Sequence, residues 1–256
     1  MYTTKRQSKK SGLIMLAAMM TLLVPISMMS FSIDLAAGVP DRVGMILTWL
    51  TDSAGSKGFL ITLTVLGLLM LRLGMSREQC LAKLIQLALI LLICFASKTG
   101  LKVMTESPRP YTEFMAEQLV IPNADHFYKL TQERQNELIE AVSASTSEWR
   151  TRHWLGETDY SFPSGHTIFA ATCVAFFAGL FLQWGRPSWA LGILVWALVV
   201  SYSRLWLGMH RPIDLFGSTA FVAAVYVILP SFSHSASRLS RLLPENGVFR
   251  LLGHKS

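Results

Sequence analysis

Long apolar runs separated by short polar connections dominate the pattern along this chain. Several of these runs approach the ~20 residues that a helix needs to cross a bilayer, and six runs are candidate spans. They cover residues 13–33, 58–71, 84–99, 167–183, 189–207 and 213–229. The second and third runs are short, and the second either extends backward through residues 43–50 or crosses a thin region at a tilt. The pattern therefore predicts an all-α, polytopic membrane protein with six transmembrane helices.

One long polar stretch, residues 100–164, separates the third predicted span from the fourth. Within it, Leu138, Ile139 and Val142 fall on one face of a helical pattern, with charged residues opposite. This spacing predicts an extra-membrane loop with helices of its own. Its amphipathic helix either rests on the protein or membrane surface or serves as a lid over a substrate. We find no internal repeat, so we expect one domain over residues 1–256, ending in a tail at 231–256.

The composition supports a membrane protein. Of the 256 residues, 52% are hydrophobic and 15% are charged, against about 25% charged in an average soluble protein. The net charge of +7 is uneven, because residues 113–159 hold nine acidic and four basic side chains and the remainder is therefore +12. A nucleic-acid-binding protein would need a clustered basic surface. Here the basic residues flank apolar runs instead, which indicates membrane topology and anion binding.

Lysine and arginine also orient the predicted spans. They concentrate before the first span, between the second and third, between the fourth and fifth, and after the sixth. With six spans, all four segments lie on one side, which the positive-inside rule makes cytoplasmic. Both termini are then cytoplasmic, and the 100–164 loop lies outside. The N-terminus could be mistaken for a signal peptide, but its apolar run is long and lacks a small-x-small cleavage site, so we expect a retained anchor.

The three cysteines do not suggest a disulfide framework. Cys94 and Cys173 lie inside apolar runs, and Cys80 lies in a short basic connection. We expect small, buried, reduced side chains.

Ionisable side chains gather at the outer ends of the last four predicted spans, where such residues are costly and often functional. They are Lys98, Lys102, Arg109, His166, Arg204, His210 and Asp214. Threading the chain through six spans places all of them on one face. An error of one span between the third and the sixth would scatter them to opposite faces.

The stretch Pro163-Ser164-Gly165-His166 begins the fourth span. Ser164 can cap the helix, and the unpaired backbone N–H groups of a helix start attract anions. His210 and Asp214 are four residues apart at the start of the sixth span, so the carboxylate can reach the imidazole across one turn. Such a contact fixes the tautomer and leaves the second ring nitrogen free.

Two histidines and an aspartate could also bind zinc or iron. Three cations share this face, however: Lys102, Arg109 and Arg204. They repel a metal ion and attract an anion with several oxygens, such as a phosphoryl group. We therefore predict a phosphate site without a metal.

Three segments together resemble the signature of the type 2 phosphatidic acid phosphatase superfamily, which includes lipid phosphatases and vanadium haloperoxidases. They read "KVMTESPRP" from Lys102, "PSGH" from Pro163 and "SRLWLGMHRPID" from Ser203. Within the superfamily, the long loop and the second and third segments are similar to bacterial phosphatases of phosphatidylglycerophosphate. These are six-helix inner-membrane enzymes with a periplasmic site.

The resemblance implies a role for each signature residue. His210 would be the nucleophile, His166 the general acid and base, and Asp214 the residue that orients His210. The phosphate would be bound by Lys102, Arg109, Ser164, Gly165 and Arg204. The resemblance further implies hydrolysis of phosphatidylglycerophosphate, undecaprenyl diphosphate and phosphatidic acid through a phosphohistidine, without metal or cofactor.

Three other functions remain open from the residues. A lipid transporter would use the predicted phosphate site for binding alone and would give neither histidine a chemical role. A haloperoxidase would hold vanadate in the same place, and a phosphotransferase would use an acceptor other than water. The expected partners are lipid phosphates and the bilayer, with no nucleic acid and no obligate protein partner.

Overall fold

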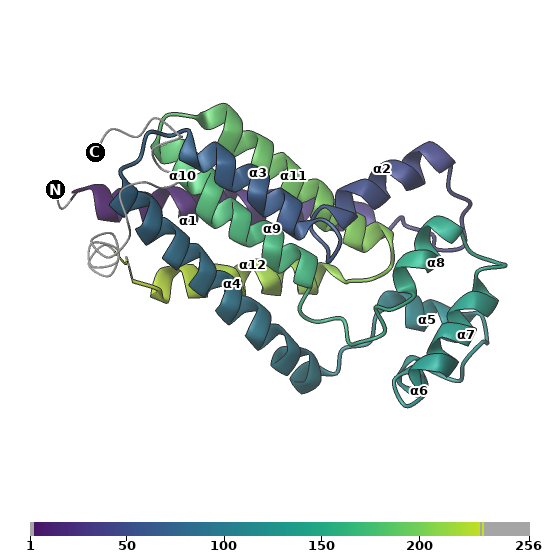
Figure 1. The fold of residues 1–256 in the computed structure, drawn as a ribbon. Coiled ribbons are helices and arrows are strands. Elements are labelled where there is room, and N and C mark those ends of the chain that lie inside the picture. Colours follow the sequence, from purple (N-terminus) through teal and green to yellow (C-terminus); the bar gives the residue numbers. More distant parts are fainter. Residues whose placement is uncertain (1–2, 231, 233–256) are drawn as a thin grey trace.

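The computed structural model describes residues 3–230 and residue 232, and all regular secondary structure in this part of the chain is helical (Figure 1). This confirms the all-α prediction. The predicted tail at 231–256 lies outside the described residues apart from Phe232. The elements are α1 Thr3–Ser30, α2 Asp41–Asp52, α3 Phe59–Leu71, α4 Arg77–Thr105, α5 Pro110–Glu117, α6 Ala124–Phe127, α7 Gln132–Val142, α8 Glu148–Trp154, α9 Gly165–Cys173, the π-helical turn η1 Val174–Ala178, α10 Gly179–Gln183, α11 Pro187–Trp206 and α12 Pro212–Ile228.

All six predicted apolar runs form helix in the structure. In the part of the chain that the structure describes, four stretches are long and apolar enough to cross a membrane: Lys9–Ser30, Arg77–Glu117, Gly165–Gln183 and Pro187–Trp206. The helices α3 and α12 are apolar but shorter, at 13 and 17 residues. Length and composition thus support four crossings directly.

The backward extension of the second run through residues 43–50 is wrong. These residues belong to α2, which ends at Asp52 and is separated from α3 by the turn at residues 53–58. The Ser53 hydroxyl donates to the carbonyl of Leu50 and helps to end the helix. Helix α2 instead packs against α8, where Gly44 lies on the ring of Trp149.

The continuous helix formed by α9, η1 and α10 is the centre of the bundle. Of its apolar window, 83% is buried, against 33% for α1 and 28% for α4. Helix α1 packs on η1 and α10, while α4, α11 and α12 pack on α9. A Cβ atom on Gly179 would lie 2.5 Å from the Cα atom of Gly12, so glycine is needed for the backbones of α1 and α10 to approach this closely. The three cysteines are free and buried, as expected.

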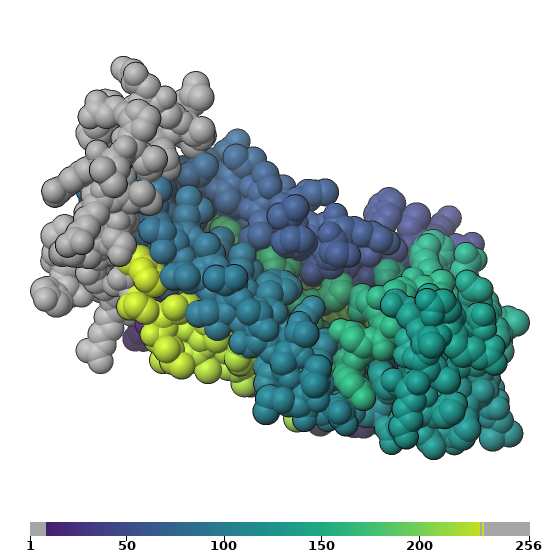
Figure 2. Space-filling view, turned by 60° about the horizontal axis from the view of Figure 1, so that its bottom comes forward, coloured from purple at the N-terminus to yellow at the C-terminus, as the bar shows by residue number. Residues whose placement is uncertain are grey.

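Helices α5 to α8 form a lobe with its own apolar core at one end of the bundle (Figure 1), and its teal residues make a rounded mass in Figure 2. Tyr111 and Trp154 stack in this core with ring centroids 4.9 Å apart. The Trp154 indole N–H donates to the carbonyl of Leu207, 2.7 Å away, and so fastens the lobe to the end of α11. Leu138, Ile139 and Val142 of α7 are buried. The amphipathic helix therefore rests on the protein.

Candidate active site

The predicted site residues converge where the lobe meets the helix bundle. Four of them lie on the helices that end or begin there: Lys102 in the last turn of α4, His166 in the first turn of α9, Arg204 in the last turn of α11 and Asp214 in the first turn of α12. The connections supply the rest, with Arg109 just before α5 and His210 between α11 and α12. All are buried except Gly165 and His166, which are half-buried.

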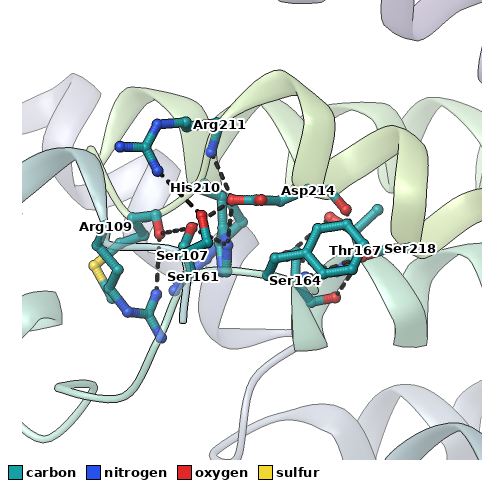
Figure 3. A network of polar contacts seen from close by, with 12 residues as sticks. Ser107, Arg109, Ser161, Ser164, Thr167, His210, Arg211, Asp214 and Ser218 are labelled. Carbon is teal, nitrogen blue, oxygen red and sulfur yellow. Dashed lines mark hydrogen bonds and ion pairs between the residues drawn. The ribbon is translucent and has the colours of Figure 1, made fainter. Parts of the chain in front are cut away.

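His210 and Asp214 are in contact, as their spacing predicts. The Nδ1 atom of His210 lies 3.3 Å from the Oδ2 atom of Asp214 (Figure 3). The same oxygen accepts the backbone N–H of Arg211 at 2.8 Å and the hydroxyl of Ser161. Nδ1 therefore carries the hydrogen of a neutral ring, and Nε2 carries the lone pair.

Burial lowers the pKa of His210 well below its ordinary value, and Arg109, Arg204 and Lys102 lower it further, against an opposing effect of Glu157. The ring is therefore uncharged at neutral pH. A neutral imidazole keeps the lone pair that a nucleophile needs. His166 lies near enough to interact electrostatically with His210, and both rings interact with Arg109, Arg204 and Glu157.

Ser164 caps α9, as its position before a helix predicts. Its hydroxyl oxygen accepts the backbone N–H of Thr167 at 3.3 Å and the Thr167 hydroxyl at 3.0 Å. The backbone N–H of Ser164 in turn donates to the Ser218 hydroxyl of α12, 2.9 Å away. A Cβ atom on Gly165 would lie 3.4 Å from the Nζ atom of Lys98, so a fourth cation stands at this helix start.

Two carboxylates occupy the space in front of the three predicted phosphate-binding cations. Glu157 lies 2.7 Å from an Nη atom of Arg204 and 3.8 Å from one of Arg109. Asp159 lies 2.5 Å from Arg109 and 3.1 Å from Lys102. The cations are at most 7% exposed at the side chain, whereas Glu157 and Asp159 are 36% and 57% exposed. The two acids therefore extend from the surface toward three buried cations.

The positive charges around Glu157 and Asp159 keep both acids ionised. Burial would raise the pKa of Glu157, but Arg204, His166 and Arg109 hold it well below its ordinary range. Burial likewise opposes ionisation of Asp159, and Arg109 and Lys102 lower its pKa instead. The three cations thus pair with two carboxylates of the chain itself.

Five contributors to the site escaped the sequence interpretation. Thr51 accepts the Nη1–H of Arg204 at 3.0 Å, and a Cβ atom on Gly55 would lie 2.7 Å from the Nε2 atom of His166. Ser161, Glu157 and Asp159 precede the "PSGH" stretch directly. The signal for Glu157 and Asp159 was the sequence "GETDYSFPSGH", in which these acids lie beside a segment predicted to bind an anion. Nothing in the local sequence marked Thr51 or Gly55.

The described part of the chain contains no group of three or more His, Cys, Asp and Glu side chains arranged to hold a metal ion. The donors that the site offers are instead guanidinium, ammonium, hydroxyl and backbone N–H groups, which suit a phosphoryl group.

Comparisons with known proteins place the chain in one family. The PAP2 superfamily model matches residues 83–238. The chain is 35% identical over 191 residues to phosphatidylglycerophosphatase B of Haemophilus influenzae, covering 72% of this chain and 79% of the relative. It is 34% identical over 145 residues to phosphatidylglycerophosphatase B of Escherichia coli, covering 56% of this chain and 57% of the relative. An undecaprenyl-diphosphatase of Sulfolobus acidocaldarius is 43% identical over 58 residues, which is 23% of this chain and 26% of the relative.

The family match covers more than half of the chain and includes all three signature segments. The chain therefore belongs to the PAP2 superfamily, as a phosphatase whose similar relatives are named phosphatidylglycerophosphatase B and undecaprenyl-diphosphatase.

Proposed function

We propose that this chain is a metal-independent phosphatase of membrane lipids. It converts phosphatidylglycerophosphate to phosphatidylglycerol and undecaprenyl diphosphate to undecaprenyl phosphate, and it also acts on phosphatidic acid. The observation that carries the proposal is the clustering of His210, which contacts Asp214, with His166 and three buried cations at one place in the fold. The names of the similar relatives support phosphatidylglycerophosphate and undecaprenyl diphosphate as substrates.

The proposed setting is the bacterial inner membrane, with the chain as one domain crossing it six times. Four stretches long enough to span and two shorter apolar helices support this count. Both termini would be cytoplasmic, and the lobe and site periplasmic. The support is the concentration of Lys and Arg in the connections away from the site.

The first chemical step is an in-line attack on phosphorus by Nε2 of His210. A nitrogen–phosphorus bond forms as the bond from phosphorus to the lipid oxygen breaks. The ring becomes positively charged, and the Asp214 carboxylate, in contact with Nδ1, stabilises that charge. His166 gives a proton to the departing oxygen. A positioned acid of this kind contributes on the order of 10²–10⁴ in rate.

The second step hydrolyses the phosphohistidine. His166, now neutral, takes a proton from a water molecule whose oxygen attacks phosphorus. The nitrogen–phosphorus bond breaks, the electron pair returns to Nε2 of His210, and inorganic phosphate leaves. Both histidines end as they began, so the cycle needs no metal or cofactor.

Lys102, Arg109 and Arg204 would hold the phosphoryl oxygens in both steps, with the start of α9 supplying backbone N–H groups. Glu157 and Asp159 stand where those oxygens would bind, so we propose that the substrate phosphate displaces them. Only the phosphate must leave water, because the acyl or prenyl chains can remain in the bilayer beside the helices. One site could therefore accept lipids with different tails.

The test is phosphate release from purified protein in detergent, with phosphatidylglycerophosphate, undecaprenyl diphosphate and phosphatidic acid in parallel. We expect release from wild type in the presence of a chelator and none from His210→Ala. Equal release by both proteins would refute the proposed site. Activity that a chelator abolishes and a divalent metal restores would refute the metal-free mechanism. Binding without release would favour a transporter, and release only with a lipid alcohol acceptor would favour a phosphotransferase.

A further inference from the structure

The Ser161 side chain joins the segment before α9 to the pair formed by His210 and Asp214. Ser161 has no exposed surface. Its hydroxyl donates to Oδ2 of Asp214, and its oxygen lies 3.4 Å from Nδ1 of His210 (Figure 3). The carbonyl of Met209 is also 3.4 Å away. The mechanism above assigns no role to this hydroxyl, although it contacts both members of the pair.

The geometry around Oδ2 of Asp214 shows what the hydroxyl can do. This oxygen is shared by the Ser161 hydroxyl, the Arg211 backbone N–H and Nδ1 of His210. The other carboxylate oxygen, Oδ1, has no hydrogen-bond partner among the described residues. The carboxylate is therefore held through one oxygen, and its rotation is limited by the two donors that flank the histidine.

The Ser161 hydroxyl has one hydrogen, which it donates in the hydrogen bond to the Asp214 carboxylate. Its oxygen then faces the Nδ1–H of His210 only as an acceptor. The Nδ1–H is thus shared between Asp214 at 3.3 Å and Ser161 at 3.4 Å. Two acceptors on one side of the ring hold its plane more firmly than one, and they hold Nε2 toward the phosphate site.

Ser161 is itself fixed in place. Its backbone N–H donates to the carbonyl of Ser107 at 2.8 Å, which ties it to the connection between α4 and α5. It stands three residues before Ser164, which caps α9. The hydroxyl therefore comes from a segment anchored at both sides, as a group that orients a catalytic ring must be.

We propose that Ser161 is a positioning residue for the nucleophile, acting through Asp214 and Nδ1 of His210. This inference rests on the proposed function. Because the side-chain hydrogen-bond partners of Ser161 among the described residues are Met209, His210 and Asp214 and none of the three cations, its loss would slow the chemistry and spare substrate binding. Loss of a hydrogen bond to a charged group corresponds to a fall in kcat of about tenfold.

The experiment measures kcat and KM for a short-chain phosphatidic acid, and the Ki of inorganic phosphate, in wild type, Ser161→Ala and Thr219→Ala. Thr219 is the matched control: it is a buried hydroxyl of α12 whose bond goes to the carbonyl of Leu215 in its own helix. We expect Ser161→Ala to lose about tenfold in kcat with KM and Ki unchanged. Thr219→Ala should stay within about twofold of wild type.

A second measurement tests the route through Asp214. In an Asp214→Asn background, Ser161→Ala should cost little more, because the partner through which it acts is already changed. An unchanged kcat in Ser161→Ala would overturn the inference. So would a raised phosphate Ki, an equal loss in Thr219→Ala, or the same loss in both backgrounds. Failure of the proposed function would look different, because wild type and His210→Ala would then release phosphate equally.

Discussion

The carboxylate of Glu157 lies 2.7 Å from the guanidinium of Arg204, an arginine with no exposed surface. In this pair, a buried cation of the candidate site already forms an ion pair with an acid of the chain. A substrate phosphate that binds Arg204 must therefore take the place of a carboxylate. The affinity of the site for phosphate is the difference between these two interactions.

The first prediction concerns this exchange. Glu157→Gln keeps the shape of the side chain and removes its charge, so phosphate no longer competes with a carboxylate for Arg204. We expect the Ki of inorganic phosphate to fall by about tenfold, the scale of one charge-assisted hydrogen bond. The measurement is competitive inhibition of phosphatidic acid hydrolysis. Glu137→Gln is a control, since Glu137 is an exposed acid of α7 whose ion pair is with Arg134. A Ki that rises in Glu157→Gln would mean that Glu157 chiefly positions Arg204.

The second prediction concerns the close approach of Gly55 to His166. A Cβ atom at Gly55 would stand 2.7 Å from Nε2 of the imidazole. The turn at residues 53–58 is restrained from moving away from the ring, because the Trp196 indole N–H donates to the Ser53 hydroxyl at 2.9 Å. Gly55→Ala should displace the ring and lower kcat by about 10²-fold, as expected for a catalytic group misplaced by about 1 Å.

Its control is Gly67→Ala in α3, where an added Cβ atom meets nothing within 4 Å. That variant should keep full activity. The Ki of phosphate should be unchanged in both variants, since neither glycine contacts the cations. A fully active Gly55→Ala would show that His166 does not need its present position.

The third prediction concerns pH and stability. His153 of α8 lies 3.3 Å from the Thr48 hydroxyl and is 8% exposed. Burial, followed by the charge of Arg204, lowers the pKa of His153 to about 4, although Asp52 opposes this. Between the unfolded pKa of about 6.5 and this value, the unfolded chain binds a proton that the folded chain excludes. The free energy of unfolding therefore decreases as pH falls through this window.

His153→Gln can keep the bond to Thr48 without titrating. It should reduce the slope of unfolding free energy against pH in this window by up to about 1.4 kcal/mol per pH unit. The measurement is unfolding of wild type and variant in detergent at a series of pH values from 7 down to about 4. Parallel curves for the two proteins would contradict the assignment of this proton to His153.

The six principal helices, the contact between His210 and Asp214 and the cap of α9 were predictable because each has a local signal. Apolar runs predicted the six principal helices, and the four-residue spacing of His210 and Asp214 predicted their contact. Ser164 before an apolar run gave the cap of α9. The boundary between α2 and α3 was not predictable in this way, since α2 is also rich in apolar residues but packs on α11 and α8 as a separate helix.

The remaining parts of the site depend on contacts between distant segments. Thr51 reaches Arg204 across 153 positions of sequence, and Ser161 reaches Asp214 across 53. No periodicity or spacing rule connects such pairs. The charge of Glu157 and Asp159, beside a segment predicted to bind an anion, could have indicated a place in the site. Only the fold shows that these acids pair with Lys102, Arg109 and Arg204.

The most direct test of the account is the identity of the phosphorylated residue. In the proposed mechanism His166 activates water, so in His166→Ala the covalent intermediate should persist after mixing with phosphatidic acid labelled in its phosphate. We predict label on His210, released slowly, and none in His166→Ala combined with His210→Ala. Label on another residue, or full hydrolysis by His210→Ala, would contradict the account.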